Sequence, residues 1–200
     1  MKKIIGVDKK TDLQYLNMYQ CSYLVDGQYY HYNFASRRNQ NELECLGIHK
    51  VDAVRILPYF VKDDKTYVIL IKEFRYPINS YIFSVPAGLI DENEEGLDAA
   101  KRELKEEIGA EVVKIELVQK ASYTGAGLSD EVIECYEAEV KLSYAQDLGS
   151  FEDISIKTLL IDDLLTFIEQ NNVGMQSALQ LKEFYYRHKY ESAFKNKEKN

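Results

Sequence analysis

The sequence predicts an α+β fold with a mixed β-sheet, preceded by a small antiparallel β unit. Three observations predict it. Six apolar, β-prone segments recur between residues 51 and 160 with one helical segment among them, and two helical patterns follow. Two short aromatic segments in the first fifty residues are joined by a hairpin signal. We therefore predict an N-terminal antiparallel unit over residues 1–50 and a main domain over residues 51–195.

The N-terminal unit is predicted from two aromatic segments, YQCSYLV at residues 19–25 and QYYHYNFAS at residues 28–36. Asp26-Gly27 stands between them, and this dipeptide favours the tight turn of a hairpin. An isolated hairpin is marginally stable in water, so we expect this unit to pack against a partner.

The main domain is predicted from segments that are either alternating or fully apolar, as strands of a half-buried or buried sheet are. The predicted strands and C-terminal helices are residues 51–60, 66–74, 81–88, 112–122, 131–143 and 154–160, then helices at 162–172 and 175–194.

One helix is predicted between the third and fourth of these strands. Apolar residues recur along it at the helical period: Leu97, Ala100, Leu104 and Ile108. This stripe should pack on the sheet. Gly109 follows, and glycine is suited to the left-handed conformation that ends many helices.

Three carboxylates crowd the end of the same helix. Glu103, Glu106 and Glu107 stand where the backbone carbonyls give the helix its negative pole, and carboxylates are disfavoured there. Glu103 and Glu107 also form a like-charge pair one turn apart, which costs about 0.2–0.5 kcal/mol. Arg102 can brace Glu106 from one turn earlier. A solvated acidic face is one interpretation of the cluster, and a bound cation is the other.

The segment before the helix favours the cation. Pro86-Ala87-Gly88 and an acidic loop bring a strand, a turn and the helix to one place. Carboxylates that face backbone carbonyls suit a hard divalent cation, Mg²⁺ before Zn²⁺. The histidines lie outside this segment, which argues against zinc: His31, His49 and His188. A Mg²⁺ site that keeps its waters typically also holds substrate phosphates.

The composition limits the classes of partner that we expect for this protein. The chain of 200 residues has 25 Lys and Arg against 33 Asp and Glu, and its net charge of −8 repels polyanions, so we expect no nucleic acid partner. No segment reaches the roughly 18 apolar residues of a membrane span, so we expect a soluble protein without a membrane partner. Three widely spaced cysteines and a start without a signal-peptide pattern favour a cytoplasmic location.

The spacing of Gly88, Glu94 and the segment RELKEEIGA at residues 102–110 resembles the Nudix box. The flanking segments EFRYPINSYIFSVPAGLID and SYTGAGLSDEVIECYEAEV are similar to the ADP-ribose pyrophosphatase branch of that family, and the resemblance covers residues 51–190. It implies a Nudix-type mixed β-sheet sandwiched by helices. It also implies a homodimer in whose formation the small N-terminal sheet takes part.

The resemblance assigns roles to residues of the box. It implies four metal ligands: Glu103, Glu106, Glu107 and the backbone carbonyl of Ala87. It implies four structural positions: Gly88, Glu94, Arg102 and Gly109. The implied cation is Mg²⁺, with Mn²⁺ as a substitute.

Other candidate residues lie outside the box. Arg75 and Glu131 are candidates for substrate binding, although a structural ion pair is an equally good interpretation of Arg75. In the branch that this sequence resembles, an acidic loop before the last strand supplies the base that activates water, and the resemblance implies Glu152, in the loop QDLGSFEDIS, for that role. Asp153, Glu131 and a metal-bound hydroxide are the alternatives. Three tyrosines are candidates for stacking on a nucleobase: Tyr29, Tyr30 and Tyr32.

The implied function is Mg²⁺-dependent hydrolysis of the diphosphate bond of a nucleoside diphosphate sugar, with ADP-ribose giving AMP and ribose 5-phosphate. Ala126-Gly127 stands where many members of that branch have Pro-Gly, which makes the substrate less secure than the reaction. The alternatives are another nucleotide sugar of the GDP-mannose type, a nucleoside triphosphate or dinucleotide, and a nucleotide-sugar sensor without enzymatic activity.

Overall fold

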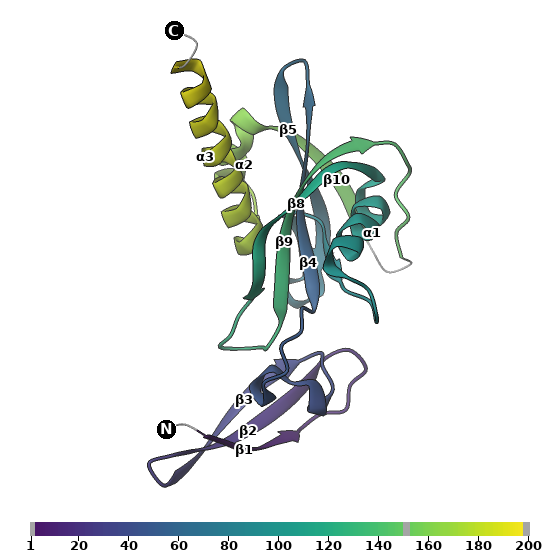
Figure 1. Ribbon diagram of the computed structural model, residues 1–200. Helices are drawn as coiled ribbons and strands as arrows, with labels where there is room; N and C mark the ends of the chain where they lie inside the picture. The colour runs from purple at the N-terminus through teal and green to yellow at the C-terminus, as the bar shows by residue number, and fades with distance from the viewer. Residues whose placement is uncertain (1–2, 150–152, 198–200) are drawn as a thin grey trace. The chain divides into compact units, whose positions relative to one another are not determined.

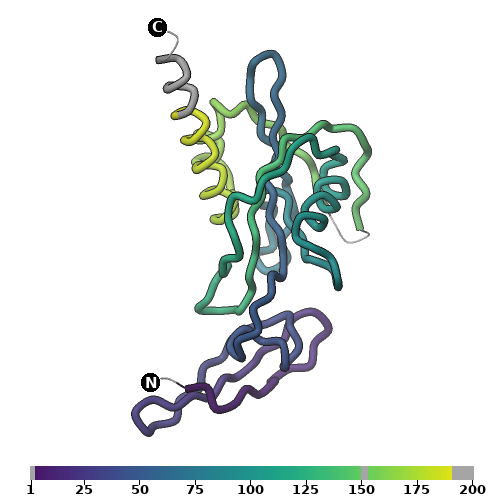
Figure 2. Tube along the Cα trace, viewed as in Figure 1, coloured from purple at the N-terminus to yellow at the C-terminus, as the bar shows by residue number. Residues whose placement is uncertain are grey.

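The structure is a computed structural model, and it describes residues 3–149 and 153–197 (Figure 1). The chain forms two compact units, which are described separately. The first comprises Met1–Ala53 with Gln119–Glu134, and the second comprises Val54–Val118 with Cys135–Asn200. The first unit thus includes a segment from the middle of the chain (Figure 2). The domain boundary near residue 50 stays a prediction.

The first unit contains a three-stranded antiparallel sheet. Its strands are β1 (Lys3–Lys9), β2 (Asn17–Val25) and β3 (Gln28–Ser36), in the order β1-β2-β3. Asp26 and Gly27 join β2 to β3 with φ angles of 51° and 82°, the left-handed values that a tight hairpin turn requires. The predicted hairpin is confirmed, whereas β1 was not predicted.

The core of this unit lies on one face of the small sheet. Tyr19, Cys21 and Phe34 are buried there together with Leu43. Leu43 lies between two short 3₁₀ helices, η1 (Gln40–Glu42) and η2 (Glu44–Leu46), which follow β3. These helices therefore cover one part of the sheet, and Tyr29, Tyr30 and Tyr32 remain exposed.

The second unit is built on a seven-stranded sheet. The order is β10-β5-β4-β9-β8, with β6 paired to β5 and β7 paired to β4. The strands are β4 (Ala53–Lys62), β5 (Lys65–Arg75), β6 (Ser80–Ser84), β7 (Ala87–Leu89), β8 (Ala110–Tyr123), β9 (Val132–Leu142) and β10 (Ile154–Leu160). The short 3₁₀ helices η3 (Tyr76–Ile78) and η4 (Ile161–Asp163) precede β6 and α2.

Helices cover both faces of this sheet. Helix α1 (Gly96–Ile108) lies on one face, and α2 (Leu164–Gln170) and α3 (Met175–Lys197) lie on the other (Figure 1). Strand β5 shows why, because its apolar side chains alternate between the faces: Ile69 and Ile71 join the core under α1, whereas Val68 and Leu70 join the core under α2 and α3. The predicted α+β fold, with a mixed sheet between helices and a small N-terminal antiparallel sheet, is confirmed.

Two local predictions were wrong. Residues 81–88 do not form one strand, because pairing breaks at Val85-Pro86, where Pro86 has no N–H to donate to a ladder. Leu97 does not belong to the buried stripe of α1. Leu97 lies in the first turn of α1 and is 42% exposed, whereas Ala99, two residues later, is buried.

Within the described residues, no helix combines the length and the apolar content that crossing a lipid bilayer requires.

Candidate active site

The acidic loop and α1 are joined by Arg102. Its Nε and one terminal nitrogen bind the two carboxylate oxygens of Glu94 at 3.0 and 2.9 Å, and that terminal nitrogen also donates to the carbonyl oxygen of Leu89 at 2.9 Å. The hydrogen bond with Glu94 raises the pKa of Arg102, and the same bond lowers the pKa of Glu94. One guanidinium therefore fixes the loop, the end of β7 and the middle of α1 to one another.

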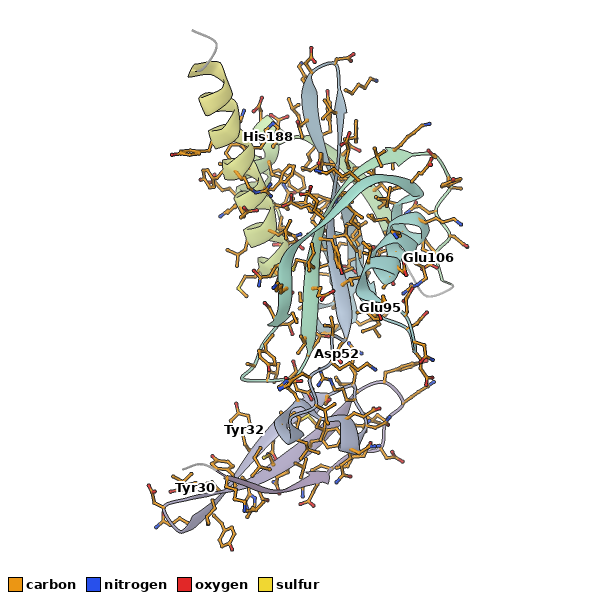
Figure 3. The ribbon with its side chains drawn as sticks, viewed as in Figure 1. Tyr30, Tyr32, Asp52, Glu95, Glu106 and His188 are labelled. Carbon is orange, nitrogen blue, oxygen red and sulfur yellow. The ribbon has the colours of Figure 1, made fainter. Side chains whose placement is uncertain are left out.

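The same guanidinium holds two of the predicted metal ligands. The second terminal nitrogen of Arg102 donates to Glu103 Oε1 at 2.7 Å and to Glu106 Oε2 at 3.1 Å. The Arg102–Glu106 contact spans one helical turn, as its spacing predicts. Glu106 and Glu95 are labelled on this part of the chain in Figure 3.

Glu107 lies on the buried side of the helix and is 5% exposed. Its Oε2 accepts a hydrogen bond from the backbone N–H of Ala87 at 3.2 Å. Glu107 is therefore not part of a solvated acidic face. Burying a carboxylate costs free energy unless partners compensate its charge.

Gly88 allows the helix to approach the strand. A Cβ atom at this position would lie 1.8 Å from Glu103 Oε1, so the Glu103 carboxylate fills the space that any other side chain would take. Gly109 ends the helix with φ of 62° and ψ of 32°, and its N–H donates to the carbonyls of Leu104 and Lys105. The predicted left-handed cap is confirmed.

The donor atoms of this site fit a hard divalent cation. Three carboxylates, those of Glu94, Glu103 and Glu106, contact one guanidinium, and Glu107 adds a fourth at the Ala87 backbone. This leaves an excess of negative charge, and all the donors are oxygens. In residues 3–149 and 153–197, no three acidic, histidine or cysteine side chains converge as a preformed metal site. Here the Glu103 and Glu106 carboxylates point to the same nitrogen of Arg102, so binding a cation requires these two side chains to rotate.

Arg75 takes part in an ion pair. One of its terminal nitrogens lies 2.8 Å from Glu73 Oε1, and the buried Glu73 also accepts a hydrogen bond from Ser84 Oγ at 2.6 Å. This is the structural alternative that the sequence left open. The Arg75 side chain is half exposed, and its role in substrate binding stays a prediction.

The other sequence candidates lie apart from the box residues in the chain. Glu131 belongs to the first unit, where Thr124 Oγ1 donates to it at 2.8 Å and Arg37 Nε lies 3.7 Å away. Glu152 lies outside the described residues. Its neighbour Asp153 accepts a hydrogen bond from Tyr81 Oη, which raises the pKa of Tyr81.

The first unit contains a network that sequence reasoning missed. Arg38 binds Asp52 at 2.8 Å through each of two nitrogens and binds Glu44 Oε2 at 2.8 Å. Burial raises the pKa of Glu44, but hydrogen bonds from Tyr123, Arg38 and His49 lower it to about 2. No pattern of local spacing predicts this network, because its members are separated by loops in the sequence and come into contact only when the chain folds.

A cavity of about 600 Å³ adjoins this network within the first unit. Aromatic rings and acidic groups line it, among them Tyr23, Tyr32, Tyr123, Glu44 and Asp130. Of the three tyrosines considered for stacking, Tyr32, which is labelled in Figure 3, lines the cavity. Its hydroxyl donates to the carbonyl of Gly127 at 2.6 Å.

Comparisons with known proteins agree with this geometry. The model of the NUDIX domain matches residues 49–171. The chain is 31% identical over 112 residues to an ADP-ribose pyrophosphatase of Bacillus subtilis, a match that covers 55% of this chain and 60% of that protein. It is also 31% identical over 154 residues to putative nudix hydrolase 2 of Caenorhabditis elegans, covering 71% of this chain and 66% of that protein. The matches thus span less than two thirds of either relative.

A solved structure described as an ADP compounds hydrolase superposes with a TM-score of 0.68 at 20% identity, over 94% of this chain and 95% of that one. At this identity the likeness concerns the fold. The resemblance of the sequence to the Nudix box and to the ADP-ribose pyrophosphatase branch is confirmed by the sequence matches. The chain belongs to the Nudix family.

Proposed function

We propose that this protein hydrolyses the diphosphate bond of a nucleoside diphosphate sugar with the help of a divalent cation. The observation that carries the proposal is the group of four glutamates around Arg102 and the Ala87–Gly88 backbone. This group has more negative charge than one guanidinium balances, which suits it to a cation that itself binds phosphate oxygens.

The box residues divide into ligands and supports. Glu103, Glu106, Glu107 and the carbonyl of Ala87 would hold Mg²⁺, or Mn²⁺ in its place. The bound cation would neutralise charge on the diphosphate oxygens and make phosphorus a better electrophile. Glu94 and Arg102 keep the loop against the helix, so that the carboxylates stay at the strand–helix junction.

The substrate we propose is ADP-ribose. Water adds to one phosphorus, the bridging P–O bond breaks, and the products are AMP and ribose 5-phosphate. The support comes from the match to the Bacillus subtilis ADP-ribose pyrophosphatase and from the resemblance of the segments around the box. Arg75 and Glu131 are proposed to contact the substrate, at the cost for Arg75 of its ion pair with Glu73.

Activation of the water is assigned to Glu152. The box carboxylates are committed to the cation, so a base must come from elsewhere. Asp153 is the alternative in the same loop, and its carboxylate accepts a hydrogen bond from Tyr81 Oη just before β10. Replacing each acid with its amide separates the two, because only the base should lower kcat strongly while leaving cation binding intact.

We also propose a cytoplasmic homodimer. The small sheet and the segments around it expose apolar side chains that a partner would cover: Ile5, Leu13, Tyr15 and Tyr29. The three cysteines are free, which is compatible with a reducing compartment. Light scattering at micromolar concentration should give twice the mass of the chain, and a monomer mass would reject the dimer.

The function is tested by incubating purified protein with Mg²⁺ and a panel of nucleotide sugars, triphosphates and dinucleotides. Chromatography of the products should show AMP and ribose 5-phosphate from ADP-ribose, and none after chelation of the metal. Preferential cleavage of a GDP-sugar would change the substrate but keep the reaction. Tight binding of a nucleotide sugar without turnover would identify a sensor instead.

A further inference from the structure

The C-terminal end of α1 is closed by a segment that follows β9. A helix leaves its last carbonyls without partners inside the helix. The carbonyl of Glu106 accepts a hydrogen bond from the backbone N–H of Asp147 at 2.9 Å, and the carbonyl of Glu107 accepts one from Gln146 Nε2 at 2.6 Å. Residues 143–147 therefore cap the turn that carries two of the candidate metal ligands.

The contact continues past the helix end through the backbone. The N–H groups of Ser143 and Tyr144 donate to the carbonyl of Gly109 at 3.1 and 2.9 Å. A Cβ atom at Gly109 would lie 2.2 Å from the Tyr144 carbonyl oxygen, so the segment passes the helix end at a distance that only glycine permits. The ammonium group of Lys105 also lies 5.8 Å from the centre of the Tyr144 ring.

Gln146 contributes its side chain to this contact, and it is half-buried. Its amide holds the backbone of Glu107, while the Glu107 carboxylate is held by the N–H of Ala87. The residue is thus fixed at both its backbone and its side chain. A short amide–carbonyl bond is well suited to this position, because a carboxylate there would oppose the negative pole of the helix.

We propose that Gln146 is a positioning residue of the Nudix helix. By holding the Glu107 carbonyl it fixes the last turn of α1, which carries the two carboxylates, Glu106 and Glu107, that would hold the cation. The inference rests on the proposed function, since it concerns the geometry of the same cation site. It goes beyond the box, because Gln146 belongs to a segment that follows a different strand.

The test replaces Gln146 with Met, which keeps the length of the side chain but removes the donor. Gln170→Met is the matched control, since Gln170 is exposed on α2. Hydrogen exchange of the peptide over residues 103–110 should become about three- to tenfold faster in the Gln146 variant. The dissociation constant for Mn²⁺, measured without substrate by electron paramagnetic resonance, should rise by about the same factor.

Three results discriminate between the possibilities. If the Gln146→Met protein keeps both the exchange rate and the Mn²⁺ affinity of the wild type, the inference is overturned. Faster exchange with unchanged Mn²⁺ affinity also overturns it, because Gln146 would then be a structural cap alone. The wild type tests the proposed function separately. If it binds Mn²⁺ and hydrolyses the substrate, the proposed function stands whatever the variant does, and if it does neither, the proposed function is rejected.

A milder variant covers the case in which Gln146→Met does not fold. Gln146→Asn keeps the amide on a shorter side chain, and its Mn²⁺ affinity should fall between those of the wild type and the Met variant. At saturating Mn²⁺, the Michaelis constant for the nucleotide substrate should stay unchanged in all folded variants, because Gln146 acts through the helix backbone. An affinity in the Asn variant equal to that of the wild type would count against the inference.

Discussion

Two arginines, one in each compact unit, bind carboxylates in nearly the same way. Arg38 holds Asp52 through two nitrogens, each at 2.8 Å, and Arg102 holds Glu94 through two nitrogens at 3.0 and 2.9 Å. Both also donate to backbone carbonyls. They differ in exposure, because the Arg38 side chain is 4% exposed and the Arg102 side chain is 28% exposed.

They differ further in the charge around them. The Arg38 cluster has two carboxylates, and each of these accepts hydrogen bonds from other fixed donors: Glu44 from Tyr123 and His49, and Asp52 from the N–H of Val132. Around Arg102, by contrast, Glu103 and Glu106 share one nitrogen. Glu107 adds a further buried carboxylate.

Similar residue types therefore have different roles in the two units. A guanidinium enclosed by carboxylates and carbonyls that satisfy one another is a structural joint. A guanidinium with more carboxylates than it can balance, beside a backbone turn, leaves room for a second cation. The difference lies in the surplus of negative charge and in the access of solvent, and both can be tested by substitution.

The largest expected effect is the loss of the closed cluster, which consists of Arg38, Glu44 and Asp52. Arg38→Met should lower the free energy of unfolding by about 3–5 kcal/mol, because it leaves the carboxylates of Glu44 and Asp52 buried without their cation. Urea unfolding measures this. Arg37→Met is the control, since Arg37 is 45% exposed and its ion pair with Glu131 is loose at 3.7 Å, so the expected change is about 0–1 kcal/mol. Equal effects of the two substitutions would contradict the comparison.

The next effect concerns the open cluster, which consists of Arg102 with Glu94, Glu103, Glu106 and Glu107. Glu107→Gln should lower kcat by at least about a hundredfold, since it removes the charge of one proposed metal ligand while keeping the shape of the side chain. Stability should stay the same or rise slightly, because the like-charge pair with Glu103 is relieved. Steady-state kinetics and thermal unfolding provide the two values. Glu111→Gln, at an exposed position on β8, serves as the control, and near-normal activity of the Glu107 variant would remove the metal-ligand assignment.

A smaller effect is the pH dependence of stability. Hydrogen bonds lower the pKa of Glu44 from its ordinary value of 4.5 to about 2 in the folded chain. Its contribution to stability is therefore fully present above pH 4.5 and is lost as the pH falls through 2. Glu44→Gln should be less stable than the wild type at pH 6, with a difference that narrows toward pH 2. Urea midpoints across this range measure it, and a constant difference would show that the Glu44 charge does not contribute.

The sequence predicted the features that depend on local spacing. The Asp26-Gly27 hairpin, the helix that ends at Gly109 and the carboxylates of its last turns all follow from residues within a few positions of one another. The bond between Arg102 and Glu94 also lies within one loop and helix. These features are therefore determined by residues that lie close together in the sequence.

The features that escaped prediction depend on distant partners. Strand β1 has charged ends and becomes a strand because it pairs with β2. In the sequence, nothing distinguishes Arg38 from an exposed arginine. Its role depends on contacts with Glu44 and Asp52 that form when β3 and the loop after it fold together. Gln146 meets Glu107 only because the turn after β9 passes the end of α1. Nothing in the spacing of these residues indicates such contacts.

The smallest expected loss of activity comes from Gly88→Ala. The new Cβ would lie 1.8 Å from Glu103 Oε1, yet that atom is the end of a flexible side chain, so rotation of Glu103 should limit the loss of stability to about 1 kcal/mol. The displaced carboxylate would no longer hold the proposed cation, and kcat should fall about tenfold. Gly6→Ala is the control, since nothing lies within 4 Å of a Cβ built there. Thermal unfolding measures the stability, steady-state kinetics measure kcat, and Mn²⁺ titration measures the cation affinity. If Gly88→Ala kept full cation affinity, Glu103 would belong with the structural partners of Arg102, as Glu94 does, and the open cluster would resemble the closed one more closely than its charge suggests.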